Sequence, residues 1–277
     1  MKPNRHIDIM GIVNLTDDSY FAASRCPSPD IALKMIEKML ADGADIIDIG
    51  ACSSRPGSTP VGPDEEWKRL EVVLKALATA FPGVRVSIDT YWSSVVERAY
   101  GLIGDFMVND ISAGEDDPLM LPVVGRLGLE YVAMHKRGTS VDMQSMTCYD
   151  DVVAEVIMYF NDFAIKAQEC GMRKWILDPG FGFAKTVGQN YELLAGLSDI
   201  RKAHPGHGLL VGVSRKSMIY KYLDITPEES LPATQAVHMA ALMGGADILR
   251  VHDVKEARQT VLLYDMLLHG SQVFLVG

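Results

Sequence analysis

Residues 45–59 read DIIDIGACSSRPGST, and this stretch joins an apolar run to a polar loop. The run at residues 45–51 has the length and the isoleucine content of a strand that is buried inside a protein. The serines, arginine, proline and glycine that follow are typical of a loop with restricted backbone freedom. A buried strand that ends in such a loop predicts a binding site at the carboxyl end of the strand.

Seven further apolar runs of similar length are spread along the chain. The eight runs occupy residues 6–14, 45–51, 84–90, 105–112, 130–136, 174–180, 208–214 and 247–253. Between them lie helical patterns, at residues 29–44 (with Gly43 near the end), 64–81, 92–102, 150–171, 233–246 and 254–270. Parallel strands need helical crossovers, and eight strands can close a barrel. The pattern therefore predicts a single (β/α)8 TIM barrel over residues 1–277, in preference to an open doubly wound sheet.

Length, composition and charge agree with one domain of this size. The chain has 277 residues, 48% of them hydrophobic, and a formal net charge of −10. This charge disfavours non-specific binding to nucleic acid or to an anionic membrane, but leaves room for a small anionic ligand. The four cysteines lack metal-type spacing, and no apolar stretch resembles a signal peptide or a membrane span. We therefore expect a soluble cytoplasmic protein.

Polar residues stand at or just after the end of every predicted strand. They are Asn14, then Ser53, Ser54 and Arg55, then Asp89, Asn109 and Asp110, His135 and Lys136, Asp178, then Ser214, Arg215 and Lys216, and finally Arg250, His252 and Asp253. The carboxyl ends of barrel strands meet at one mouth, where the sites of such barrels are built. Asp, Asn and Ser there have a second explanation as helix caps, and the sequence 178-DPG-180 as a turn. Cations are unfavourable at helix N-termini, so their presence predicts an anionic ligand.

The residue types at this mouth indicate two kinds of binding. Arg250 and His252 alternate along a strand and therefore point to the same side, and Arg55 joins them from another loop, which suits a phosphate or pyrophosphate. Asp89 and Asp178 end buried strands and suit a flat heterocycle with adjacent N–H groups. The sequence contains no dinucleotide fingerprint, serine elbow or zinc cluster, so neither a dinucleotide site nor a protein nucleophile is indicated.

Eight short motifs together carry a family resemblance. In chain order they are IMGIVNLTDDS, GADIIDIGACSSRPG, VSIDT, VNDISAG, VAMHKRG, ILDPGFGFAKT, GVSRKS and LRVHDV, from about residue 9 to residue 254. Each motif is weak alone, but the ordered set resembles the dihydropteroate synthases, pterin-binding barrels of folate synthesis that sulfonamides target. The resemblance implies condensation of 6-hydroxymethyl-7,8-dihydropterin pyrophosphate with p-aminobenzoate, assisted by Mg²⁺, in a homodimer.

The resemblance also implies residue roles. The pterin ring would be bound by Asp89, Asn109, Ile111, Met134, Asp178 and Lys216. The catalytic residues at the pyrophosphate would be Asn14, Arg55, Arg250 and His252, with Asn14 as the magnesium ligand. The p-aminobenzoate pocket would be lined by Ser54, Pro56, Phe183 and Ser217, with Tyr20 near it. The family reaction is thought to be dissociative, with the bond to pyrophosphate breaking before the amine adds.

The chain departs from the family pattern in its first two loops. Asp17 stands in place of a proline, Tyr20 in place of a phenylalanine, Ala22 in place of an acid, and Cys52 in place of a glutamate. Three rival functions remain open from the sequence. They are a folate-binding methyltransferase barrel, a Schiff-base aldolase using Lys136 or Lys216, and a non-catalytic pterin-binding homologue.

Overall fold

Eight parallel strands close into a barrel in chain order in the computed structural model, which describes residues 6–15, 28–52, 61–138 and 142–270. The strands are β1 (Asp8–Asn14), β2 (Ile46–Gly50), β3 (Arg85–Asp89), β4 (Met107–Asp110), β5 (Glu130–Met134), β6 (Trp175–Asp178), β7 (Gly208–Val211) and β8 (Ile248–Val251). The pairing of β8 with β1 completes the ring. The predicted (β/α)8 barrel is confirmed, and the open sheet is excluded.

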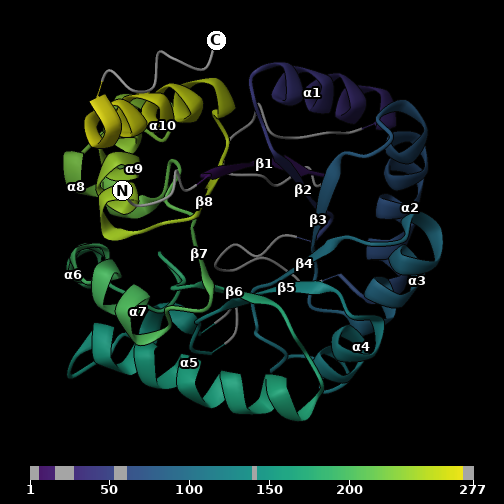
Figure 1. The fold of residues 1–277 in the computed structure, drawn as a ribbon, viewed down its shortest axis with the longest axis horizontal. Helices are drawn as coiled ribbons and strands as arrows, with labels where there is room; N and C mark the ends of the chain where they lie inside the picture. Colours follow the sequence, from purple (N-terminus) through teal and green to yellow (C-terminus); the bar gives the residue numbers. More distant parts are fainter. Residues whose placement is uncertain (1–5, 16–27, 53–60, 139–141, 271–277) are drawn as a thin grey trace.

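Helices surround the barrel as an outer ring (Figure 1). They are α1 (Pro29–Ala41), α2 (Pro63–Ala80), α3 (Ser93–Ile103), α4 (Met120–Leu127), η2 (Met143–Ser145), α5 (Val152–Glu169), α6 (Val187–Ala195), α7 (Leu197–Ala203), α8 (Ser217–Leu223), α9 (Leu231–Gly244) and α10 (Val254–His269). The six helical patterns of the sequence correspond to α1, α2, α3, α5, α9 and α10. The helices α4, α6, α7 and α8 were missed because each has nine residues or fewer, which is too short for a clear period.

Local sequence signals explain where several helices begin and end. The Ser28 side chain accepts a hydrogen bond from the first turn of α1, and Pro29 suits the first helical position. Gly43 follows the end of α1 with φ +98°, a conformation that favours glycine. Thr186 and Gln189 form a reciprocal capping box at the start of α6. Chain direction at these points is therefore set by the residues themselves.

Alternation along each strand divides the strand side chains between two packing regions. An inner cluster fills the lower part of the barrel and consists of Met10, Ile46, Met107, Val132, Ile176, Leu210 and Ile248. Strand residues of the opposite parity, such as Ile9, Ile47 and Val108, pack outward against the helices in the larger core. Each such side chain contributes roughly 1.5–3 kcal/mol through burial. The inner cluster forms an apolar floor beneath the barrel mouth.

No helix in the described part of the chain is long and apolar enough to span a bilayer.

Candidate active site

The inward parity of the strands brings most predicted site residues to the barrel mouth. Asn109, Met134, Asp178 and Arg250 each lie two residues beyond a member of the apolar floor, on the same side of their strands. The register places Asp89 beside Asn109, and Met134 beside Asp178. The predicted pterin residues within the strands therefore form one continuous inner wall.

Arg250 joins the two sides of this mouth through a pair of carboxylates. From β8 its Nη2 lies 2.7 Å from Asp89 Oδ2 and 2.6 Å from Asp48 Oδ2, while its Nε donates to Asp48 Oδ2 at 2.7 Å. The expectation that the carboxylates and the arginine gather at one end of the barrel is met for these residues. A carboxylate and a guanidinium that lie this close together can bind a ligand that carries both N–H donors and negative charge.

Asp48 belongs to this network although the sequence analysis assigned it no role. Its side chain is 0% exposed, and it accepts hydrogen bonds from Ser87 Oγ at 2.6 Å and from Asn109 Nδ2 at 3.2 Å. A signal was present in the sequence, because Asp48 interrupts the otherwise apolar strand IIDIG. A charge in the middle of a buried strand needs partners inside the fold, and such partners are often functional.

Burial shifts the charge states of the mouth residues. Burial raises the pKa of Asp89 to about 7, against the lowering effect of Arg250 and with a further rise from Asp48. Burial also raises the pKa of Asp178, opposed chiefly by Lys216. The pKa of Lys216 is lowered to about 8 by burial, and Asp178 opposes that shift. Groups with such shifts in a recessed site mark a candidate active site.

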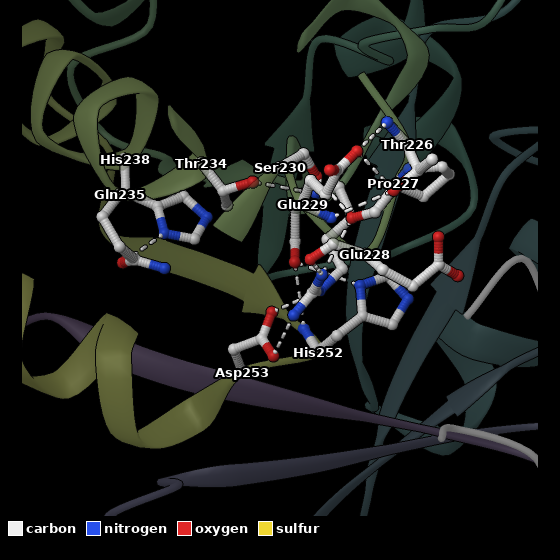
Figure 2. A network of polar contacts seen from close by, with 12 residues as sticks. Thr226, Pro227, Glu228, Glu229, Ser230, Thr234, Gln235, His238, His252 and Asp253 are labelled. Carbon is white, nitrogen blue, oxygen red and sulfur yellow. Dashed lines mark hydrogen bonds and ion pairs between the residues drawn. The ribbon is translucent and has the colours of Figure 1, made fainter. Parts of the chain in front are cut away.

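His252 lies in a second polar network at the ends of β7 and β8 (Figure 2). Its Nδ1 lies 3.0 Å from Ser214 Oγ, and its backbone N–H donates to the same hydroxyl at 3.2 Å. Burial and the nearby Arg250 lower the pKa of His252 to about 3. The sequence analysis counted His252 as a cation, and this is a correction: the imidazole is neutral at pH 7, so it acts as a hydrogen-bonding group.

Arg215 ties the loop after β7 to the start of α10. Its guanidinium binds Asp253 through two hydrogen bonds of 2.8 and 2.9 Å. Its Nη1 donates to the carbonyls of Pro227 and Glu228 at 2.8 Å each, which holds the segment between α8 and α9. Arg215 has φ +52°, a strained value for a residue with a side chain. The residues next to it in sequence, Ser214 and Lys216, are positioned by this network.

The loop after β6 places an aromatic ring beside Lys216. Lys216 Nζ donates to the Phe181 carbonyl at 2.6 Å and lies 5.0 Å from the centroid of the Phe183 ring. Ser217 begins α8 directly after Lys216. Phe183 and Ser217, the two predicted p-aminobenzoate residues that the structure describes, thus both adjoin Lys216, a predicted pterin residue.

A buried lysine stabilises the same loop. Lys185 Nζ donates to the carbonyls of Gly180 and Phe183 at 2.9 and 3.1 Å, and lies 3.0 Å from His135 Nδ1. Burial lowers the pKa of Lys185 to about 7 and that of His135 to about 2. His135 is therefore neutral, and its Nδ1 can accept a hydrogen bond from Lys185 Nζ. The sequence analysis placed His135 at a strand end but found no role for Lys185.

Helix capping does not account for the two predicted pterin carboxylates. The residue that caps α3 is Trp92, so Asp89 is not its cap. Asp178 accepts a hydrogen bond from the Gly180 N–H at 2.8 Å, as a turn residue would, while α6 is capped by Thr186. The turn interpretation thus explains one oxygen of Asp178, and no capping role explains Asp89.

Two of the nucleophile candidates that the structure describes at the mouth, Cys52 and Lys136, are not activated. Burial raises the pKa of the Cys52 thiol, which disfavours the reactive thiolate. Lys136 forms an ion pair of 2.6 Å with Asp116, which occupies one of the two lysines of the Schiff-base alternative. The other, Lys216, faces the Phe181 carbonyl and Asp178. The lowered pKa of Lys216 is the feature of this site that favours the Schiff-base alternative.

Two further observations bear on metal binding. Asn14 ends β1 with a half-buried side chain, and its register partner Gly50 lies next to Asp89. Within the described ranges, the one cluster of His and carboxylate groups with metal spacing is His6, Asp8 and Asp45, at the opposite end of the barrel. There Asp8 pairs with Arg85 and Asp45 with Arg258, so arginines already neutralise the carboxylates.

Several predicted residues lie outside the described part of the chain. They are Ser53, Ser54, Arg55 and Pro56 of the second loop and Asp17, Tyr20 and Ala22 of the first. Of the remaining predicted residues, Ile111 follows β4 and is half-buried at the mouth.

The chain is similar to known proteins over nearly all of its length. The profile of the family described as pterin binding enzyme matches residues 10–252. A dihydropteroate synthase of Escherichia coli K12 is 38% identical over 269 residues, which cover 96% of this chain and 94% of the relative.

Solved structures agree with the sequence comparison. The dihydropteroate synthase of Yersinia pestis in complex with a sulfonamide drug superposes with a TM-score of 0.89 at 35% identity, covering 96% of this chain and 95% of that one. The enzyme of Thermus thermophilus in complex with 4-aminobenzoate superposes with a TM-score of 0.83 at 36% identity, covering 95% of both chains.

Proposed function

Because the chain belongs to the family of pterin-binding enzymes, we infer that it catalyses the dihydropteroate synthase reaction of folate synthesis. In this reaction the amine of p-aminobenzoate replaces pyrophosphate on the methylene of a dihydropterin. The observation that carries the inference is the arrangement of Asp89, Asp178 and Arg250 at one barrel mouth, in a chain similar to this family from end to end. A folate-binding methyltransferase would need the carboxylates but not the cationic side chains that would bind pyrophosphate.

The pterin ring would lie against the inner wall of the mouth. Asp89 and Asp178 would accept hydrogen bonds from ring N–H groups, and Asn109 and Lys216 would bind its polar edge. Met134 and Ile111 would pack against the faces of the ring. The support is that the inward residues among these share one wall by register, with the apolar floor below.

The leaving group would lie toward Arg250, His252 and Arg55. As the bond from the methylene carbon to the pyrophosphate oxygen breaks, its electron pair leaves with pyrophosphate, and the pterin methylene becomes a ring-stabilised cation. The amine nitrogen then forms the new bond to carbon, and its proton passes to the released pyrophosphate or to water. Arg250 stabilises the departing charge, and neutral His252 donates a hydrogen bond. This order of steps needs charge stabilisation more than a general base.

Asn14 is a suitable ligand for a magnesium ion at this site. Mg²⁺ prefers oxygen ligands, keeps several waters and is commonly held by one or two side chains together with substrate phosphates. Asn14 offers an amide oxygen at the mouth, and Gly50 beside it adds no side chain. A bound Mg²⁺ would supply charge neutralisation to the pyrophosphate oxygens. Asn14 would hold the diphosphate end of the substrate in place.

The second substrate would bind on the side of Phe183 and Ser217. The ring of Phe183 offers an apolar face, and Ser217 at the start of α8 offers a hydroxyl for a carboxylate. Ser54 and Pro56 of the second loop would complete this pocket. The T. thermophilus relative in complex with 4-aminobenzoate supports a site of this kind.

A pyrophosphate-release assay tests the proposed function. We expect release to require the pterin pyrophosphate, p-aminobenzoate and Mg²⁺ together, and a chelator to stop it. Tight binding of the pterin without release would instead support a non-catalytic homologue. Borohydride trapping with a carbonyl substrate would reveal a Schiff base and support the aldolase.

We also propose that the protein acts as a homodimer in the reducing cytoplasm. The outer faces of α9 and α10 expose large apolar side chains, namely Met243, Leu262, Leu263, Leu267 and Leu268. Exposed apolar side chains gathered on adjacent helices are typical of an interface. Within the described ranges Cys52, Cys148 and Cys170 form no disulfide, which agrees with a reducing compartment.

A further inference from the structure

Asp48 lies below the ligand-binding wall, where four donor atoms converge on its carboxylate. It stands between Ile46 of the apolar floor and Gly50 at the mouth, and its side chain is 0% exposed. Arg250 donates through Nε and Nη2, Ser87 donates through Oγ, and Asn109 Nδ2 lies 3.4 and 3.2 Å from the two carboxylate oxygens. Asp48 is thus enclosed by protein groups, and its position beneath the wall keeps it from direct contact with a ligand.

Ser87 and Arg250 bind different oxygens of Asp48, whereas Asn109 Nδ2 contacts both oxygens. Ser87 Oγ binds Oδ1 at 2.6 Å, whereas Arg250 binds Oδ2 through both Nε and Nη2. Ser87 therefore fixes the rotation of the carboxylate, and the carboxylate fixes the plane of the guanidinium. Without this support, the long side chain of Arg250 would have many rotamers available.

Arg250 is also shared with Asp89, whose Oδ2 lies 2.7 Å from Nη2. In the proposed function the N–H groups of a pterin ring donate hydrogen bonds to the Asp89 carboxylate, and Arg250 binds the pyrophosphate leaving group. The contact between Arg250 and Asp89 must then loosen, while the contacts of Nε and Nη2 with Asp48 stay available. One carboxylate is engaged by the substrate, and the other keeps the arginine in place.

We propose that Asp48 is a positioning residue of the condensation: it orients Arg250 toward the pyrophosphate and Asn109 toward the pterin, without touching either. This inference rests on the proposed function. It concerns a residue to which the family resemblance gave no role. Groups that orient a metal ligand from behind typically affect activity by about 10–100-fold, and we expect an effect of the same order for a group that orients a guanidinium.

Asp48→Asn tests the proposal, with Asp45→Asn as the matched control. Asparagine keeps the size of Asp48 and removes its charge. We expect kcat to fall about 10–100-fold, with the KM for p-aminobenzoate changed less than about threefold. Asp45 pairs with Arg258 at the other end of the barrel, so Asp45→Asn should leave kcat within about twofold.

The pH dependence of kcat/KM is a second measurement, and it should stay unchanged if Asp48 only stabilises the fold. Asp48 raises the pKa of Asp89, so its neutralisation should shift the acid limb of the kcat/KM profile to lower pH. The charged and titratable groups that act on or respond to Asp89 are Asp48 on β2, Asp110 on β4, Arg250 on β8, Cys52, Glu66 and Lys216. All except Asp48 are unchanged in the variant.

Ser87→Ala provides a second variant if Asp48→Asn does not fold. It removes one hydrogen bond from Asp48 and keeps the charge, so we expect a fall in kcat of a few-fold with the KM for p-aminobenzoate unchanged. Full kcat in both variants, or in Ser87→Ala when it alone folds, would overturn the positioning role while leaving the proposed function intact. A wild-type protein that releases no pyrophosphate would overturn the proposed function instead.

Discussion

The charge state of Asp89 is the property of a single residue that most directly affects the proposed ligand. Its pKa is raised to about 7 by burial, with Arg250 opposing the shift. An ionised carboxylate accepts two N–H groups of a pterin, whereas a protonated one accepts fewer. We expect the affinity for 6-hydroxymethylpterin to fall by up to about tenfold per pH unit below pH 7, as measured by titration calorimetry.

Asp89→Asn is the control for this pH dependence. The variant should bind the pterin weakly and with a flat profile between about pH 5.5 and about pH 7.5, because the titrating group is gone. The contribution of Asp89 to the free energy of unfolding depends on pH in the opposite direction to its contribution to pterin binding. Its folded-state pKa is higher than its unfolded one, so its contribution is fully present below about pH 4 and is lost as pH rises through about 7. A pH profile of binding that is the same in both proteins would contradict the assignment.

Gly180 is a position where the side chain must be absent. It has φ +71°, and an added Cβ would lie 1.9 Å from the carbonyl oxygen of His135. Gly180→Ala should therefore displace the loop that carries Phe183. We expect a loss of at least about 3 kcal/mol in the free energy of unfolding, and a raised KM for p-aminobenzoate.

Gly128→Ala separates the steric effect from the backbone effect. Gly128 follows α4 with a similar φ of +72° and a left-handed helical backbone, but an added Cβ would meet nothing within 4 Å. We expect only about 1–2 kcal/mol of destabilisation from the left-handed backbone, with unchanged KM values, in denaturant unfolding and steady-state assays. Equal losses for the two variants would show that the contact with the His135 carbonyl is unimportant.

At the scale of elements, the arginine network joins the end of β7, the segment between α8 and α9, and the start of α10. Arg215 is 6% exposed and makes four hydrogen bonds across these elements, as given above. Arg215→Gln should lower the free energy of unfolding by roughly 3–5 kcal/mol because it leaves Asp253 buried without its partner. It should also lower kcat, because Ser214 and Lys216 flank Arg215.

Arg201→Gln is the matched control at the other end of β8. Arg201 binds Asp247 and the His207 carbonyl and is 30% exposed. We expect a loss of about 1 kcal/mol in chemical denaturation and no change in kcat. If Arg201→Gln impairs turnover as strongly as Arg215→Gln, the effect is one of general stability rather than of loop placement.

At the scale of the whole molecule, the exposed apolar faces of α9 and α10 predict assembly. Leu267 is 74% exposed on α10, and Leu263 on the same helix is 62% exposed. The double variant Leu263→Glu with Leu267→Glu should convert a dimer to a monomer, because a charged side chain buried at an interface is strongly unfavourable. Light scattering after size-exclusion chromatography measures this.

Leu119→Glu is the control for the assembly experiment. Leu119 is 63% exposed and precedes α4, which lies across the barrel from α10 (Figure 1). The control should keep the wild-type mass. A wild-type protein that is monomeric at all concentrations would contradict the dimer, and a dimer that persists in the double variant would place the interface elsewhere.

The sequence alone determined the barrel and much of its mouth. The strand around Asp48 and the seven similar strands could be predicted because a buried strand appears in the sequence as a short apolar run. Alternate residues of a strand face the same side, which directs Asp89, Asn109, Asp178 and Arg250 inward. These signals are local, so they survive in a single chain without coordinates. The short helices α4, α6, α7 and α8 were not legible because two helical turns carry too little periodic signal.

Only the tertiary structure decided which side chains form ion pairs and hydrogen bonds with one another at the mouth. Arg250 meets Asp48 across 202 residues and Asp89 across 161, contacts that exist only once the ring of strands has closed. The neutrality of His252 could not be predicted from the sequence either, because its pKa depends on burial and on Arg250 and not on the residue type alone. Local patterns are set by the backbone within a few residues, whereas pairing and desolvation depend on every neighbour that the fold brings near.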